Sequence, residues 1–325
     1  MSKPEIVAEI VRSGFVEGHH YGSVVALDAD GSVAWSVGDA DGPMLARSCN
    51  KPLQALGMVR LGLDLPPDLL ALACASHSGE DFHLDGVRRI LAGAGLDESA
   101  LQTPPDHPLD DVAREEAIRA GRAKDPISMN CSGKHAAMLA TCVLRGWDVA
   151  TYRDADHPLQ VAIAATFAEL TSEPVEVVAV DGCGAPLLST SLTGLARAFR
   201  ALAVADGGPE RRVADAIRQH PANVSGTRRD ELGLLTALPG AIGKAGAESC
   251  YAVALPDGRA VALKTDDGAP RVRPVLMAAA LRRSGVHDEA VDATGVLPLL
   301  GGGRQVGEIR ATFEAAPPAA DGAHV

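Results

Sequence analysis

The chain has 325 residues, of which 46% are hydrophobic, and a formal net charge of −12. This length provides a sizeable core in one large domain or two smaller ones, and the acidic balance, without a lysine- or arginine-rich run, argues against a nucleic-acid partner. No apolar stretch approaches the ~20 residues that cross a bilayer, and the first residues lack the charged-then-apolar pattern of a signal peptide, so we expect a cytoplasmic protein with no membrane partner.

The beginning of the chain has the pattern of β structure. Apolar runs predict strands over residues 6–11, 23–27 and 33–37. Asp28-Ala29-Asp30-Gly31, between the second and third runs, is typical of a hairpin turn. We therefore expect an antiparallel sheet to start here.

Helical periodicity dominates the middle of the chain. Leu53, Leu56 and Val59 recur at helical spacing after Pro52, and proline is tolerated in a first helical turn because its missing N–H would have no partner there. Further helices are predicted around residues 85–94, 111–120 and 135–144. These patterns predict a helical lobe over roughly residues 50–170.

The remainder of the chain is mixed and returns to β structure at its end. Residues 174–180 predict a buried strand, and residues 192–203 and 210–219 predict helices. Strands are predicted over residues 250–255, 260–264 and 306–313, with a helix over 272–284 between the last two. We expect a mixed α/β (α+β) fold in a single domain, residues 1–314, whose sheet is built from both chain ends around a mostly helical middle. A disordered tail is expected over residues 315–325.

Lysine is rare in this chain, and its positions are informative. Only six of the 30 cationic side chains are lysines. Lysine can lose its proton and act as a base or a ligand, whereas the guanidinium of arginine stays charged. Four lysines lie in compact motifs with serine, cysteine or glycine: Ser48-Cys49-Asn50-Lys51, Asn130-Cys131-Ser132-Gly133-Lys134-His135, Lys244-Ala245-Gly246-Ala247-Glu248 and Leu263-Lys264-Thr265-Asp266-Asp267-Gly268. Together they indicate a serine–lysine amide hydrolase.

Ser48 and Lys51 are one helical turn apart, so their side chains face each other if the segment is helical. A neutral lysine in that position can take the proton of a serine hydroxyl, and a helix N-terminus favours a developing anion. Such a pair occurs by chance about 0.3 times in a chain of this composition, so alone it is a hypothesis. It is strengthened because Ser128-Met129-Asn130 and Lys244-Ala245-Gly246 follow in the order of the S-x-N and K-T-G elements of penicillin-recognising enzymes.

Cys131 and Cys183 each lie in a glycine-containing turn. Thiolate sulfur suits zinc, and Lys134 or His135 could complete a site begun by these two cysteines. The alternative is that both are ordinary buried thiols, because no C-x-x-C pair is present.

At this point the motifs resemble those of a known family, the Rhizobium etli-type L-asparaginases. The resemblance runs from about residue 6 to about residue 313, and Asn-Cys-Ser-Gly-Lys-His is its longest motif. The residues that carry it are Arg47-Ser48-x-x-Lys51-Pro52-x-Gln54-Ala55, Cys74-Ala75-Ser76-His77-Ser78-Gly79-Glu80, Asn130-Cys131-Ser132-Gly133-Lys134-His135, Asp181-Gly182-Cys183-Gly184 and Lys264-x-x-Asp267-Gly268.

The resemblance implies a fold similar to serine β-lactamases and glutaminases, a homodimer, and hydrolysis of L-asparagine to aspartate and ammonia. It also implies a zinc ion held by two cysteines and a lysine, which match Cys131, Lys134 and Cys183. Asp181 matches an aspartate that touches metal-bound water and substrate, and Arg47 and His135 match neighbours of the active site.

The resemblance further implies two serine–lysine tandems. Ser48 and Lys51 match the first, and Ser76 matches the serine of the second. Its lysine is Lys264 or Lys244; we expect Lys264, which leaves Lys244 as a substrate-binding residue. Of the two serines, we expect Ser48 to be the nucleophile because it lies at the predicted helix start.

Two other functions remain open from sequence. A related acylating enzyme could act on glutamine or a β-lactam, and the single methylene between glutamine and asparagine is worth only ~1–3 kcal/mol of discrimination. A non-catalytic zinc protein would use Cys131 and Cys183 but would have no need of Ser48 and Lys51.

Overall fold

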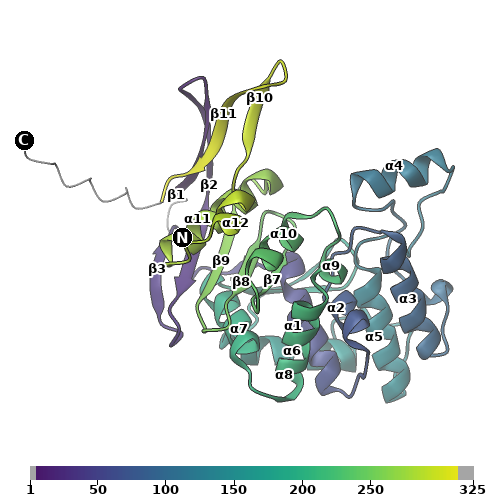
Figure 1. Cartoon of the computed structure of the whole chain (residues 1–325). Coiled ribbons are helices and arrows are strands. Elements are labelled where there is room, and N and C mark those ends of the chain that lie inside the picture. The colour runs from purple at the N-terminus through teal and green to yellow at the C-terminus, as the bar shows by residue number, and fades with distance from the viewer. Residues whose placement is uncertain (1–4, 314–325) are drawn as a thin grey trace, which may run out of the picture.

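The first and last strands of the chain lie side by side in one antiparallel sheet. The computed structural model describes residues 5–313, so the expected tail at 315–325 lies outside the described residues. The eight-stranded sheet has the order β10-β11-β1-β2-β9-β8-β7, with β3 paired to β2. The prediction of a mixed α/β fold whose sheet is built from both chain ends is confirmed (Figure 1). Its strands are β1 (Glu5–Arg12), β2 (Phe15–Leu27), β3 (Val33–Val37), β7 (Ile242–Ala245), β8 (Tyr251–Ala254), β9 (Ala260–Thr265), β10 (Pro298–Gly301) and β11 (Arg304–Ala311).

Helices fill the middle of the chain and cover the sheet. In Figure 1 they form the body of the molecule beside the sheet, while α4 projects from the body opposite the tip of β10 and β11. The helical elements are η1 (Arg47–Asn50), α1 (Lys51–Arg60), α2 (Pro67–Ala73), α3 (Asp81–Gly93), η2 (Glu98–Ala100), α4 (Asp111–Arg119), α5 (Ser132–Arg145), α6 (Pro158–Thr171), α7 (Leu192–Val204), α8 (Gly208–Gln219), α9 (Pro221–Val224), α10 (Asp230–Ala237), η3 (Pro270–Val272), α11 (Arg273–Arg283) and α12 (Glu289–Thr294).

The central strand β9 is buried over nearly its whole length, because helices pack on the sheet around it. α7 contacts β2, β8 and β9, and α11 contacts β9 and β11. Successive strand residues point to opposite faces, and five of the six residues of β9 are buried, so both faces are covered here. Within residues 5–313, no helix is long and apolar enough to cross a membrane.

The predicted helix after Asn50 is confirmed as α1, which runs through the centre of the molecule. Nine of its ten residues are buried, including the polar Lys51 and Gln54. A helix that is buried all round has no solvent-facing polar side. The side chain of Lys51 therefore ends inside the protein.

A small second sheet corrects one prediction. It has the order β4-β6-β5, with β4 (Met44–Leu45), β5 (Val178–Val180) and β6 (Pro186–Thr190). The strand expected at 174–180 exists in part, as β5, but its burial was predicted wrongly: Val178 and Val180 are 53% and 78% exposed. β5 is an edge strand, and the buried strand is its partner β6.

His83 on α3 makes the stability of the fold sensitive to acid. It is fully buried, its Nε2 lies 3.1 Å from the oxygen of Ala222, and its ring stacks on His77. Burial lowers the pKa of His83 to about 4, although the oxygen of Ala222 and the charge of Glu80 oppose the shift. Between this value and the ordinary pKa near 6.5, the unfolded chain binds a proton that the folded chain does not.

We therefore expect the free energy of unfolding to fall as the pH drops from 6.5 to 4. The loss of stability caused by His83 reaches about 3 kcal/mol near pH 4 and is absent above pH 6.5. Urea unfolding at several pH values checks this, with His83→Gln as the comparison. An equally steep pH dependence in wild type and variant would contradict the assignment to His83.

Candidate active site and metal centre

Ser48 lies at the entrance to α1, in a segment with unusual backbone geometry. The short helix η1 contains Ser48 and leads directly into α1. Its first residue, Arg47, has a φ of 48°, in the left-handed region that costs a non-glycine residue about 1 kcal/mol. The side chain of Arg47 compensates by donating to Asp181 Oδ1 at 3.1 Å and to Glu248 Oε1 at 3.2 Å.

The side-chain nitrogen of Lys51 is bound to Ser76 and not to Ser48. Lys51 Nζ donates to the oxygen of Ala75 at 2.6 Å and to Ser76 Oγ at 2.9 Å, and the residue is 1% exposed. Among the described residues, the hydroxyl of Ser48 has no hydrogen-bond partner. The expected pairing inside Ser48-Cys49-Asn50-Lys51 is thus replaced by one between the two predicted tandems, because the long lysine side chain reaches past Ser48 to the segment after α2.

Ser76 is held by backbone hydrogen bonds on both of its sides. Its N–H donates to the oxygen of Val224 at 3.2 Å, and the N–H of Ser78 donates to that of Ser225 at 2.7 Å. On the other side, the N–H of His77 donates to the oxygen of Asn130 at 3.0 Å. The segment at 224–225 was given no role from sequence, because backbone pairing between distant loops leaves no side-chain signature.

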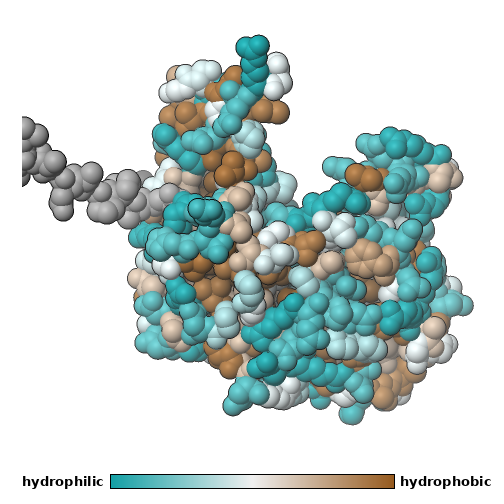
Figure 2. Space-filling view, in the orientation of Figure 1, coloured by the Kyte–Doolittle hydropathy of each residue, from teal (hydrophilic) through white to brown (hydrophobic). Residues whose placement is uncertain are grey.

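Both serines line one cavity of about 650 Å³. Asn130 and Gly246 line it too, so the three ordered motifs of the sequence contribute to one wall. Figure 2 shows the surface hollowed between the β10–β11 projection and α4; Leu109–Asp111, at the start of α4, and Leu297, just before β10, line the cavity from these two sides. A small molecule in the cavity can therefore reach both hydroxyl groups.

Gly246 lies against the backbone of Ser48, where a side chain would be crowded. A Cβ at this position would lie 3.1 Å from the nitrogen of Ser48 and 3.3 Å from that of Cys49. Within residues 5–313, the N–H groups of Ser48 and Ala247 make no hydrogen bond, and both residues line the cavity. Two free N–H groups beside a hydroxyl are the components of an oxyanion hole.

Ala247 begins a strained turn that joins β7 to β8. Glu248 and Ser249 have φ values of 54° and 50°, and the N–H of Cys250 donates to the oxygen of Ala247 at 3.3 Å. This is the pattern of a type I′ turn, which normally takes Asn and Gly. The strain is offset by contacts of the turn: Glu248 binds Arg47, and Ser249 Oγ donates to the oxygen of Ala269 at 2.9 Å.

The two remaining predicted lysines make no hydrogen bond to the hydroxyl of Ser76 in this structure. Lys264, expected to be its tandem partner, donates to the oxygens of Glu248 and Thr265 at 3.4 and 3.1 Å. It lines a separate cavity of about 390 Å³ together with Arg47 and Glu248. Lys264 therefore contacts the strained turn from outside and is not paired with Ser76 in this structure.

Lys244 is predicted from sequence to bind substrate, but its side chain does not face the cavity. Its side chain is fully buried and makes an ion pair with Glu231 at 2.7 Å. It does not line the cavity that Ser48 and Ser76 share. The K-x-G element thus contributes Gly246 to the cavity and not its lysine.

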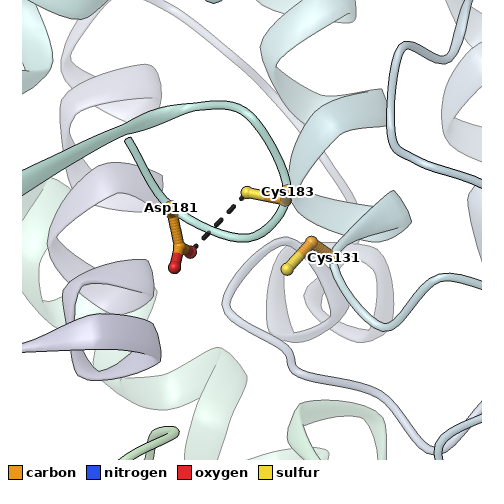
Figure 3. Close-up of side chains that lie close together, drawn as sticks. All are labelled: Cys131, Asp181 and Cys183. Carbon is orange, nitrogen blue, oxygen red and sulfur yellow. Dashed lines mark hydrogen bonds between the residues drawn. The ribbon is translucent and has the colours of Figure 1, made fainter. Parts of the chain in front are cut away.

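Cys131, Asp181 and Cys183 form a group that could hold a metal ion. Their ligand atoms all lie within 4.8 Å of one another, and Lys134 Nζ lies 3.2 Å from Cys183 Sγ. In Figure 3, Asp181 and Cys183 come from one loop, and the Cys183 sulfur points toward the Asp181 carboxylate, while Cys131, just before α5, lies beside them. A hydrogen bond from the Cys131 thiol and the charge of Lys134 outweigh burial and lower the pKa of Cys183. Two sulfurs and a carboxylate are donors that zinc accepts, and the nitrogen of Lys134 could join them once it has lost its proton.

Arg47 and His135 flank this group as predicted neighbours of the site. Arg47 links Asp181 to Glu248 on the strained turn. His135 is fully buried, its Nδ1 lies 2.6 Å from the hydroxyl of Tyr152, and burial lowers its pKa to about 4. The metal group and the serine cavity are joined through Asn130, which lines the cavity while its Oδ1 accepts from Cys131 Sγ.

The family model for L-asparaginase II matches residues 8–311 of the chain. No curated protein gives a significant match. Among solved structures, the chain is 16% identical to a β-lactamase from Mycobacterium bovis, with a TM-score of 0.43 and coverage of 82% of this chain and 95% of that one. It is 13% identical to a protein described as Mglu, with a TM-score of 0.43 and coverage of 82% and 64%. A Bacillus subtilis glutaminase in covalent complex with 5-oxo-L-norleucine is 14% identical, with a TM-score of 0.34 and coverage of 79% and 83%.

Proposed function

The chain belongs to the L-asparaginase II family, a family of amidohydrolases, and on that premise we propose that it hydrolyses L-asparagine to L-aspartate and ammonia through a serine–lysine acyl-enzyme. The observation that carries the proposal is the hydrogen bond of 2.9 Å between the buried Lys51 Nζ and Ser76 Oγ, in the wall of the cavity that also contains Ser48. A hydroxyl paired with a buried lysine can carry the proton of an attacking serine to that lysine.

In the first step, Ser48 Oγ attacks the side-chain amide carbon of asparagine. The new C–O bond forms as the carbonyl π electrons move onto oxygen, and the proton of Ser48 passes by way of the Ser76 hydroxyl to neutral Lys51, which is hydrogen-bonded to Ser76. The N–H groups of Ser48 and Ala247, free in this structure, would stabilise the resulting oxyanion. One such donor is typically worth ~10²–10³ in kcat.

In the second step, the C–N bond breaks and the leaving nitrogen needs a proton. Ser76 can donate its hydroxyl proton to that nitrogen and recover one from Lys51 through their hydrogen bond. Ammonia leaves, and an aspartyl ester remains on Ser48. Water then attacks the ester with Lys51 again as the base, which releases L-aspartate and restores both serines.

Zinc is the metal we propose for the group formed by Cys131, Cys183 and Lys134, with Asp181 beside it. When bound, the ion would hold the α-amino or α-carboxylate group of the substrate, directly or through water. The proton transfers above use only Ser48, Lys51 and Ser76, so the ion is not required for the chemical step. Arg47, which donates to Asp181, connects this anchoring group to the catalytic turn.

Substitution of the two serines tests the assigned roles. We expect Ser48→Ala to lower kcat for ammonia release from L-asparagine by at least ~10³-fold, and Ser76→Ala by ~10²-fold, because one removes the nucleophile and the other a proton donor. Ser284→Ala is the control, because the hydroxyl of Ser284 accepts a hydrogen bond from Trp35 and does not line the cavity. Mass spectrometry with a diazoketone analogue of asparagine should place the covalent adduct on Ser48.

An adduct on Ser76, together with full loss of turnover in Ser76→Ala, would exchange the roles of the two serines. Ammonia release from L-glutamine alone would assign the same chemistry to a longer substrate. Wild-type kcat in Ser48→Ala would contradict the mechanism.

Metal removal tests the zinc proposal. We expect one zinc ion per chain by elemental analysis, and its loss in Cys183→Ser, because one thiolate ligand is removed. KM for L-asparagine should rise at least ~10-fold while kcat changes less. Cys142→Ser, a buried thiol on α5 outside the group, is the control and should keep its zinc. Metal-free wild-type protein with an unchanged KM would contradict the proposal.

We also propose that the protein is a homodimer in which a second copy covers the edge strand β5. Val178 and Val180 on β5 are 53% and 78% exposed, and Val177, just before the strand, is 49% exposed. An apolar edge strand is a typical contact surface between chains. Val178→Lys/Val180→Lys should give a monomer in analytical ultracentrifugation. A dimer of unchanged stability would place the contact elsewhere.

A further inference from the structure

We propose that Glu231 is a positioning residue, which fixes the end of β7 so that the N–H of Ala247 faces the reacting carbonyl beside Ser48. The proposal rests on the acyl-enzyme function above, and it assigns a role to a carboxylate that touches neither substrate nor metal. Its basis is the set of hydrogen bonds that converge on the segment at 244–246, just before Ala247.

Glu231 lies in the first turn of α10 and is fully buried. Its Oε1 accepts from Lys244 Nζ at 2.7 Å and from the backbone N–H of Ala245 at 2.8 Å. Its Oε2 accepts from Arg229 at 3.3 Å. One carboxylate thus binds both the side chain and the backbone of the strand that leads into the turn.

The position of β7 explains why the strand needs this carboxylate. Among residues 5–313, β7 is the last strand of the sheet, so its outer edge has no neighbouring strand there. A buried backbone N–H without a partner costs about 1–3 kcal/mol, and it leaves the strand free to shift. Glu231 supplies the missing acceptor to Ala245, two residues before Ala247.

The neighbouring residue Asp230 holds the other side of the same segment. It forms a two-pronged ion pair with Arg273 at 2.9 and 2.5 Å, and Arg273 in turn donates to the oxygen of Gly246 at 3.3 Å. The guanidinium also lies 5.6 Å from the ring of Tyr251 on β8. Two adjacent carboxylates of α10 therefore hold the segment just before Ala247, one directly and one through Arg273.

The ion pair keeps Glu231 charged in a site without solvent. Burial alone would raise the pKa of this carboxyl, but Lys244, Arg229 and Arg273 hold it at about 2. A charged acceptor makes a stronger hydrogen bond to a backbone N–H than a neutral one. At neutral pH, Glu231 is therefore ionised and makes its stronger hydrogen bond to the N–H of Ala245.

Two double variants separate positioning from charge. Glu231→Gln/Lys244→Met and Glu231→Leu/Lys244→Met both remove the ion pair without leaving a lone buried charge, a change that is often tolerated. They differ in one respect: glutamine keeps an oxygen for the N–H of Ala245, and leucine does not. We expect the leucine variant to lose ~10²-fold in kcat at nearly constant KM, and the glutamine variant to stay within ~5-fold of wild type.

Amide hydrogen exchange provides a readout that does not depend on activity. In the leucine variant, exchange at Ala245, Gly246 and Ala247 should be faster than in wild type, with the rest of the sheet unchanged. Glu9→Gln, which breaks a surface ion pair with Arg310 on β11, is the control and should alter neither kcat nor exchange at the turn. Arg273→Lys tests the contacts that Arg273 makes with Asp230 and with the oxygen of Gly246, and we expect it to lower kcat ~10-fold.

Wild-type kcat and exchange in the leucine variant would overturn the proposal, as would equal losses in both double variants. Should the double variants fail to fold, Arg273→Lys with unchanged kcat and exchange would overturn it equally. If wild-type protein releases no ammonia from L-asparagine, the proposed function fails, and the exchange comparison still decides whether Glu231 fixes the turn.

Discussion

The burial of the side-chain nitrogen of Lys51 is the constraint on which the rest of the site depends. A charged or polar group away from water is costly unless it is hydrogen-bonded, and here the partners are the oxygen of Ala75 and the hydroxyl of Ser76. These partners are in position because the segment after α2 is fixed by backbone hydrogen bonds to the loop at 224–225 and to Asn130. Asn130 in turn leads into the metal group.

Residues with a strained backbone, and the contacts that offset the strain, are concentrated around Ser48. Arg47, Glu248 and Ser249 are three of the five non-glycine residues with positive φ among those described, and they lie on either side of Ser48. Backbone strain persists only where surrounding contacts over-determine it. The Arg47–Glu248 ion pair joins two of these residues directly, so the helix entrance and the turn hold each other in place. Rigid placement of free N–H groups is what electrostatic stabilisation of an oxyanion requires.

Much of this arrangement could be predicted from sequence, for identifiable reasons. The strands at both chain ends and the helix after Pro52 have strong apolar periodicity. Such periodicity indicates the side of an element that is buried. The cysteines and Ser48 occur in short motifs whose residue types carry the chemistry. The partner of Lys51 could not be predicted, because spacing along a helix does not determine where a long side chain ends. β5 was given the wrong burial because a run of valines looks the same at an exposed edge as in a core. Glu231 left no signal, since its function depends on an edge strand 13 residues away.

The pairing of the chain's two ends has a consequence for how the protein is made. β1 binds β11 at residues such as Glu9 and Arg310, which are 301 positions apart. Ribosomes add ~5–20 residues per second, so the first hairpin is made roughly 15–60 s before its last neighbour. β1 and β2 can pair at once, but their outer edges have no partners until β9 and β11 have been synthesised. Contacts so distant in sequence also close slowly after synthesis ends. The nascent chain thus carries an open sheet edge for most of its synthesis, and this edge can pair with other chains until β9 and β11 cover it.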